Sequence, residues 1–317
     1  MGDTFHLMLE FVRGFFISKR LLKGNTNCYI LNNQHIGDVC YSLSLIDSFC
    51  KEKKALNVVV IWSGKFKELY DSFDIKCLFR MSSENQRRLQ IYLLKSQTGK
   101  KLIENGRLVV TYTSFFMNSE EQESNEITVM DLLKTKSFRI SKDSLIHFPS
   151  INRNGVGNVI QSLNIKKHRT VFINPFALSM SVPVSFFQKI AKRLAEHGYD
   201  VVSNMRKEDD VPINGTKGVF LSLNDSFCLM EYCGYTVGVR SGFYDFSISA
   251  KCSFHIIYEQ EYKMKKAYSL KAWNSVHPLR EYVYKTDVEN ELIEDIISQF
   301  PFISLGVNYN IINGKIR

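Results

Sequence analysis

Hydrophobic positions along this chain follow two patterns that alternate from one end to the other. Continuous apolar runs of about five residues, bounded by turn residues, are typical of strands buried on both faces. Apolar residues three and four positions apart are typical of helices with one buried face. Because the two patterns alternate, they predict α/β domains with mostly parallel sheets. The expected strands are 28–31, 56–62, 107–112, 170–175, 199–203, 219–221, 235–239 and 254–258.

Helical spacing is clearest in 183–197, where a proline suited to the first turn precedes a strongly amphipathic run. A run of acidic and polar residues at 118–126 indicates a surface loop. The other expected helices are 38–51, 66–73, 82–97, one that Asp225 and Ser226 would cap, one that begins near Tyr244, and 288–300.

A turn-rich patch near 150–168, which holds several asparagines and glycines, separates two alternating halves. A chain of 317 residues is long enough for two domains of ordinary size. We therefore expect an N-terminal amphipathic basic segment at 1–24, a first α/β domain at 25–155 and a second at 156–317.

The first 24 residues combine apolar and aromatic side chains with Arg13, Lys19, Arg20 and Lys23. Two interpretations stay open: a helix in a membrane interface with its basic end towards anionic head groups, or a helix packed on the first domain. No run of about 18 uncharged apolar residues occurs, so no membrane-spanning helix is expected. Charged residues interrupt the apolar ones near the N-terminus, so no secretory signal is expected either.

Composition narrows the location and the partners. The seven cysteines are odd in number and lack C-x-x-C spacing, which favours buried thiols in a reducing cytoplasm over disulfides or a zinc site. The net charge of +9 is compatible with phosphorylated substrates, an anionic membrane surface, or simply a soluble lysine-rich surface. Nucleic acid is not expected as a partner, because the basic residues are dispersed and no nucleic-acid-binding motif occurs.

The turn after the expected strand 235–239 carries candidate chemistry. Arg240, Ser241 and Gly242 lead the chain into a helix, and Asp245 lies near its start. Backbone N–H groups at such a turn bind anions, and an arginine adds a permanent positive charge that suits phosphate. The pattern predicts a diphosphate site.

The turn after the expected strand 28–31 places His35 and Asp38 at a helix start. Asp38 is either a first-turn carboxylate that stabilises the helix or a general base aimed at a substrate. Ligands of parallel sheets bind at the carboxyl ends of strands, where both turns are expected to lie.

Taken in order, three segments resemble family-nine glycosyltransferases, the bacterial heptosyltransferases. Residues 36–43 look like the family's Gly-Asp-Val segment, and 172–177 are similar to the entry into its donor domain. Residues 225–251 resemble its helix, strand and Asp-Thr/Ser-Gly-Pro-x-His turn. Arg240 stands where the family has an aspartate, and 177–183 lacks the family's lysine or arginine. Arg-Ser-Gly with a following aspartate is also similar to fucosyltransferase-like GT-B enzymes.

The resemblance implies a GT-B fold, with two Rossmann-like domains whose mostly parallel sheets face a central cleft. It implies inverting, metal-independent transfer of a sugar from a nucleotide-sugar donor to a glycan or glycolipid acceptor, without a cofactor, in lipopolysaccharide or capsule biosynthesis. Asp38 would be the catalytic base, with His35 beside it. The residues implied to bind the donor are Arg240, Ser241, Gly242, Asp245, Asn174 and Pro175.

Two other functions stay compatible with the sequence. One is a different GT-B-like enzyme, such as a nucleotide-sugar epimerase, which would need further acid/base carboxylates. The other is a catalytically silent binding protein. We expect a cytoplasmic location, with peripheral attachment to the inner membrane if 1–24 lies in the interface.

Overall fold

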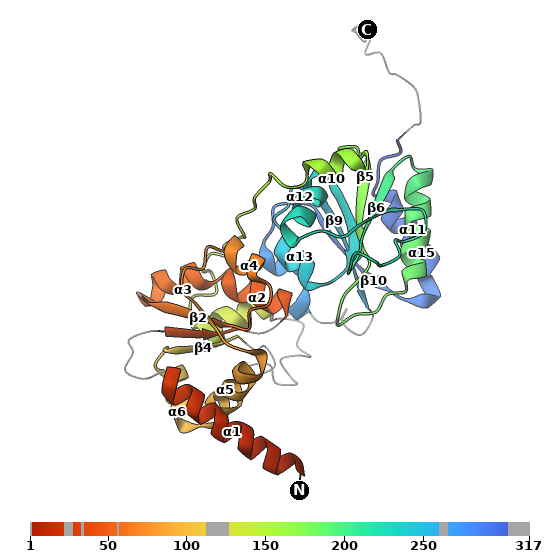
Figure 1. Ribbon diagram of the computed structural model, residues 1–317. Helices are drawn as coiled ribbons and strands as arrows, with labels where there is room; N and C mark the ends of the chain where they lie inside the picture. Colours follow the sequence, from red (N-terminus) through yellow and green to blue (C-terminus); the bar gives the residue numbers. More distant parts are fainter. Residues whose placement is uncertain are drawn as a thin grey trace. The chain divides into compact units, whose positions relative to one another are not determined.

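The computed structural model describes residues 2–21, 28–32, 35–55, 57–111, 127–259 and 266–303, and the chain forms two compact units (Figure 1). The N-terminal unit contains Met1–Arg153, Arg240–Ala250 and Gln260–His277. The C-terminal unit contains Asn154–Val239, Lys251–Glu259 and Pro278–Arg317. The sequence pattern placed all residues from 156 onwards in one domain. Two later segments join the N-terminal unit instead, because helix α13 (Gly242–Ser247) packs against α2 (Ile36–Leu43).

The N-terminal unit is built on a four-stranded parallel sheet with strand order β3-β2-β1-β4. Its strands are β1 (Cys28–Leu31), β2 (Val58–Trp62), β3 (Leu78–Arg80) and β4 (Leu108–Val110). β1 is fully buried between β2 and β4, as its continuous apolar run predicts. The short edge strand β3 was not expected, because two of its three residues are exposed and carry no buried pattern.

Helices cover both faces of this small sheet. Figure 1 shows α1 (Gly2–Leu21), α5 (Ser83–Lys95) and α6 (Gln97–Glu104) on one face. α2, α3 (Ile46–Lys53) and α4 (Lys67–Ser72) lie on the other. Among its described residues, this unit also contains α9 (Val129–Leu132), the π-helix η1 (Leu133–Phe138), α13, and the short turns η2 (Lys266–Tyr268) and η3 (Leu270–Trp273).

The helix expected at 38–51 is interrupted. α2 ends at Leu43 and α3 begins at Ile46. The hydroxyl of Ser44 donates to the carbonyl of Tyr41 at 2.8 Å, and serine side chains that bond back to the backbone favour such breaks. The interruption shortens α2 to two turns and leaves its first turn beside the end of β1.

The C-terminal unit is built on a six-stranded parallel sheet with strand order β10-β9-β8-β5-β6-β7. In chain order this is the doubly wound arrangement 3-2-1-4-5-6, whose direction of winding reverses between β5 and β8. The strands are β5 (Thr170–Asn174), β6 (Asp200–Asn204), β7 (Lys217–Val219), β8 (Tyr235–Val239), β9 (Ser253–Glu259) and β10 (Leu279–Tyr284).

Helices also flank this larger sheet. Figure 1 shows α11 (Val184–Glu196) and α15 (Glu289–Ser298) on one face, and α10 (Gly157–Ser162) and α12 (Leu223–Cys233) on the other. The turn η4 (Thr286–Val288) leads into α15. The amphipathic pattern at 183–197 is confirmed, because its apolar side chains from Phe186 to Leu194 are buried. The expected cap of α12 is wrong: Ser222, not Asp225 or Ser226, caps it by accepting a bond from the Asp225 N–H at 3.0 Å.

Among the described residues, no helix is long and apolar enough to cross a membrane. Five cysteines are buried, Cys50 is partly buried and Cys77 is exposed. The expected acidic loop 118–126 and residues 22–27 lie outside the described residues.

Candidate functional site

The turn between β1 and α2 leaves the small sheet at the point where its winding changes direction. β2 and β3 lie on one side of β1, and β4 lies on the other. Crevices at such switch points, outside the carboxyl ends of the strands, are where doubly wound sheets bind ligands. Asp38 therefore lies where this topology favours a substrate.

A buried polar network fixes the start of this turn. The side-chain oxygen of Asn32 accepts hydrogen bonds from the hydroxyls of Ser42 and, at 3.2 Å, Thr111. Its amide donates to the Tyr70 hydroxyl at 3.3 Å, and Gln86 donates to its carbonyl at 2.6 Å. Sequence reasoning missed this network, although a polar residue directly after a buried strand is a visible signal. Four side chains thus hold the chain in one position, three residues before His35.

His35 and Asp38 occupy the first turn of α2. His35 is exposed at the N-cap position, makes no side-chain cap, and accepts the Val39 N–H through its carbonyl at 3.0 Å. Asp38 is partly buried. Burial raises the pKa of Asp38 from 3.8 to about 6, with His35 lowering it and Asp245 raising it further. A carboxylate with this pKa is ionised at pH 7. Because its pKa lies close to the surrounding pH, it can also accept a proton efficiently.

α2 and α13 approach each other through two glycines. A Cβ added to Gly242 would lie 2.5 Å from the backbone nitrogen of Gly37. A Cβ added to Gly37 would lie 2.6 Å from a carboxylate oxygen of Asp245. Such separations leave no room for a side chain, so both positions require glycine for the two helix starts to meet. This contact brings the 240–245 turn to the Asp38 turn.

Arg240 and Asp245 form a buried ion pair beside this contact, with exposed fractions of 6% and 2%. The two terminal nitrogens of Arg240 donate to the two carboxylate oxygens of Asp245 at 2.8 and 2.7 Å. The remaining guanidinium N–H groups reach the carbonyls of Tyr268 and Ser241 and, at 3.4 Å, the Tyr41 hydroxyl. Burial raises the pKa of Asp245, and the Arg240 charge opposes that rise.

An aromatic cluster closes this pair off. The Trp273 indole N–H donates to Asp245 at 3.0 Å, and its ring stacks on Tyr41 at a centroid distance of 4.8 Å. The ring of Phe148 also lies near the Trp273 ring, at a centroid distance of 6.1 Å. No local pattern indicates these aromatic partners, because they come from three segments far apart in the chain.

The geometry bears directly on the predicted roles of the 240–245 turn. Arg240 would have to give up protein partners to reach a diphosphate, so its burial and its bonds argue against the direct contact expected from the sequence. The same holds for Asp245. Ser241 and Gly242 are partly exposed and remain accessible. The ion pair holds the shape of the turn that presents them.

Asn174 and Pro175 lie in the C-terminal unit, at the carboxyl end of β5, one of the two strands that flank its switch point. Both are buried. Asn174 accepts a bond from Asn204, at the end of β6, at 2.9 Å. Beyond β6, the Arg206 guanidinium lies 4.6 Å from the centre of the Phe176 ring. Neither Asn204 nor Arg206 was expected in the site, although both lie within three residues of the end of the expected strand 199–203.

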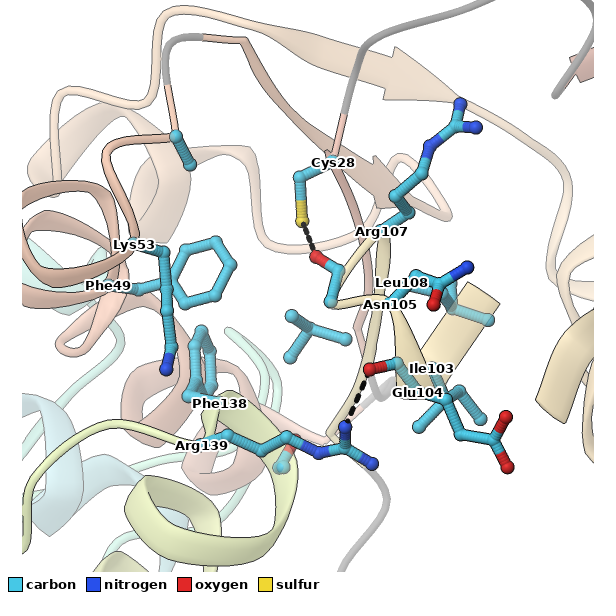
Figure 2. Close-up of a pocket in the computed structure, with 14 residues that line it drawn as sticks. Cys28, Phe49, Lys53, Ile103, Glu104, Asn105, Arg107, Leu108, Phe138 and Arg139 are labelled. Carbon is cyan, nitrogen blue, oxygen red and sulfur yellow. Dashed lines mark hydrogen bonds between the residues drawn. The ribbon is translucent and has the colours of Figure 1, made fainter. Parts of the chain in front are cut away.

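A separate hollow lies at the opposite, amino edge of the small sheet, with a volume of about 420 Å³ (Figure 2). Phe49 and Phe138 form one side, and Cys28, the first residue of β1, lies across from them. Arg139 donates to the carbonyl of Glu104, the last residue of α6, at 3.0 Å. Its charge therefore serves a helix C-terminus, which favours cations. Because ligands of parallel sheets bind at the carboxyl edge, we do not assign this hollow to the active site.

Among the described residues, no group of three or more His, Cys, Asp or Glu side chains could hold a metal ion. The sequence matches no protein-family model, and no curated protein matches it.

Solved structures, in contrast, match along nearly the whole chain. The E. coli ADP-heptose LPS heptosyltransferase II is 13% identical and has a TM-score of 0.56, with 87% of this chain and 98% of that chain covered. A family 9 glycosyl transferase from Veillonella parvula is 11% identical with a TM-score of 0.51, covering 85% and 88%. The E. coli heptosyltransferase WaaC with ADP-2-deoxy-2-fluoro heptose is 10% identical with a TM-score of 0.50, covering 86% and 99%. The expected fold class is thereby confirmed: the chain has the GT-B fold of these glycosyltransferases, with two α/β domains and parallel sheets.

Proposed function

We propose that this chain is a glycosyltransferase that moves a sugar from a nucleotide-sugar donor to a glycan or glycolipid acceptor of a bacterial surface. The fold supports this proposal, because the likeness covers both domains of heptosyltransferases and of a family 9 enzyme. One of those proteins is described with an ADP-heptose analogue, which is a nucleotide-sugar.

The observation that carries the proposal is the position and pKa of Asp38. It lies beyond the carboxyl end of β1, in the first turn of α2, with a pKa raised to about 6 by burial. A base for an inverting transfer must be ionised at neutral pH before it takes the proton of the acceptor hydroxyl, which then leaves it neutral. The pKa of Asp38 supports this role, and we propose that exposed His35 in the same turn assists it.

We propose donor contacts in each unit by itself, after β5 in the C-terminal unit and after β8 in the N-terminal unit. Asn174 and Pro175 shape the end of β5, and Ser241 and Gly242 offer an accessible turn after β8. Arg240 and Asp245, which we expected to contact the donor, instead pair with each other, and Arg240 bonds to the Ser241 carbonyl, so in this proposal they stabilise the turn. We propose that the transfer inverts the anomeric centre without a metal or a cofactor, the leaving diphosphate being stabilised by backbone N–H groups and nearby basic side chains.

A panel of nucleotide-sugars incubated with the purified chain tests this function. Release of the nucleoside diphosphate, with transfer to an acceptor or to water, supports a glycosyltransferase. Conversion of one nucleotide-sugar into another with the nucleotide intact would replace the proposal with an epimerase. Binding seen by calorimetry without any turnover would replace it with a silent binding protein.

A lipid-linked acceptor would be met at the cytoplasmic leaflet of the inner membrane. We therefore also propose that the enzyme works there, in lipopolysaccharide or capsule biosynthesis. Fractionation of the native host would place it in the membrane-associated or the free cytoplasmic pool.

A further inference from the structure

Helix α1 is fixed to the small-sheet unit by one of its faces. Gly14 lies so close to α5 that an added Cβ would be 2.2 Å from the carbonyl oxygen of Arg88. Phe11 and Phe15 pack on the ring of Tyr92 at centroid distances of 5.2 and 5.6 Å. Glu10, on the same face, is buried. For this face, the structure therefore shows the second of the two alternatives, a helix packed on the first domain.

The opposite face of α1 is also apolar and has no packing partner among the described residues. Met8, Val12 and Phe16 follow each other at four-residue spacing, so they form one stripe. Their exposed fractions are 67%, 41% and 64%. Leu9 lies beside the stripe and is exposed as well. A helix that is apolar on both faces is ordinarily buried on both, so this stripe calls for a partner.

Among the described side chains of α1, every exposed charged one is positive. Arg13, Lys19 and Arg20 are exposed and border the stripe or follow it in the last turn. The carboxylate of Glu10 is buried and pairs with three arginines, Arg13, Arg87 and Arg88, at 3.3, 3.0 and 3.1 Å, so this cluster keeps a net positive charge. An exposed apolar stripe whose described border is cationic fits a surface that is apolar inside and anionic outside.

We propose that this outer face of α1 (Met8, Leu9, Val12 and Phe16, bordered by the basic residues) is a docking surface for an anionic lipid bilayer. The apolar side chains enter the boundary between head groups and acyl chains. The basic side chains extend to the lipid phosphates. The helix lies in the plane of the membrane and leaves its inner face on α5.

A second copy of the chain is the other partner that an apolar stripe could take. Two copies meeting through this stripe would bring their cationic borders together, and like charges across an interface cost binding energy. Anionic head groups neutralise the same border. The charge pattern thus favours lipid over self-association.

Co-sedimentation of the full chain with vesicles tests this surface without any activity readout, so its outcome is separate from that of the proposed sugar transfer. The vesicles are phosphatidylcholine alone, and phosphatidylcholine with added phosphatidylglycerol. We expect binding to the anionic vesicles to be about tenfold tighter or more. Met8→Ser, Val12→Ser and Phe16→Ser together should abolish most of it, because the apolar contact is lost.

A matched control replaces three exposed apolar side chains outside α1: Leu145→Ser, Val211→Ser and Val276→Ser. It should bind as the wild type does. A second variant, Lys19→Glu with Arg20→Glu, keeps the stripe and should lose the preference for anionic vesicles. Circular dichroism checks that each variant is folded.

Three kinds of result would overturn the proposal. The first is a wild-type chain that binds neither kind of vesicle. The second is equal loss of binding in the stripe variant and the matched control, or no loss in the charge variant. The third is a lipid-free dimer of the wild type that the stripe variant converts to a monomer, which would assign the surface to a second copy.

Discussion

Removing the Asp245 carboxylate should destabilise the N-terminal unit more than any comparable surface change. Asp245→Ala leaves the Arg240 charge buried without its counter-ion, since the two side chains are 2% and 6% exposed. Breaking a buried pair from one side costs about 3–5 kcal/mol. The Trp273 indole N–H also loses its acceptor, which adds about 1 kcal/mol. We therefore expect the free energy of unfolding to fall by about 4–6 kcal/mol.

Urea denaturation followed by tryptophan fluorescence measures this loss. The chain has two tryptophans, Trp62 and Trp273, and both lie in the N-terminal unit, so their emission reports that unit's unfolding. The matched control is Asp71→Ala, which removes an exposed ion pair with Lys67 in the same unit. It should cost less than about 1 kcal/mol.

The double variant Arg240→Met with Asp245→Leu decides the cause. It removes both charges and keeps most of the volume, so it should be more stable than Asp245→Ala alone. The account of the buried pair would be refuted if Asp245→Ala cost no more than Asp71→Ala. It would equally fail if the double variant were as unstable as the sum of its single changes.

Three further changes test other parts of the site and of the fold. Gly242→Val should lower the urea midpoint of unfolding, because even a Cβ there would lie 2.5 Å from the Gly37 nitrogen. Gly157→Ala should leave the midpoint unchanged, because the space around Gly157 is open. Equal midpoints for the two variants would contradict the close approach of Gly242 to Gly37. Glu10→Gln should lower the melting temperature in calorimetry by leaving two arginines of α5 without their carboxylate, and an unchanged value would count against that cluster. Asp38→Asn should stabilise the chain by about 1–2 kcal/mol at pH 7, because the folded pKa of about 6 lies above the ordinary 3.8. The raised pKa makes wild-type stability fall as pH rises from about 4 to 6, so the stability gained by Asp38→Asn should vanish near pH 4. Destabilisation by Asp38→Asn at both pH 4 and pH 7 would contradict the raised pKa.

The strand and helix pattern was predictable where each element had a clear period. β5, β8 and α11 are long, buried on the expected side and close to their expected limits. The edge strands β3 and β10 were not predicted, because edge strands bury few residues and contain polar residues among the apolar ones. The break between α2 and α3 escaped because serine hydroxyls end α2 without a proline or glycine to signal it.

The candidate site was predictable residue by residue but not as an assembly. Asp38 and the 240–245 turn were visible because each follows a buried strand and opens a helix. Their meeting depends on Gly37 packing against Gly242, a contact between distant segments that no local period encodes. The buried pairing of Arg240 with Asp245 could not be read either, since its burial depends on Trp273 and Tyr41.

We propose Asp38 as the base of a sugar transfer, and the turnover of Asp38→Asn is the measurement that decides this role. The assay uses the nucleotide-sugar that the wild type consumes, at saturating concentration. Asp47→Asn is the matched control, because Asp47 is an exposed carboxylate in the first turn of α3. The account predicts that Asp38→Asn stays folded and loses about 10²–10⁴-fold in turnover, while the control keeps the wild-type rate. Retention of more than about a tenth of wild-type turnover by Asp38→Asn, or an equal loss in the control, would contradict it.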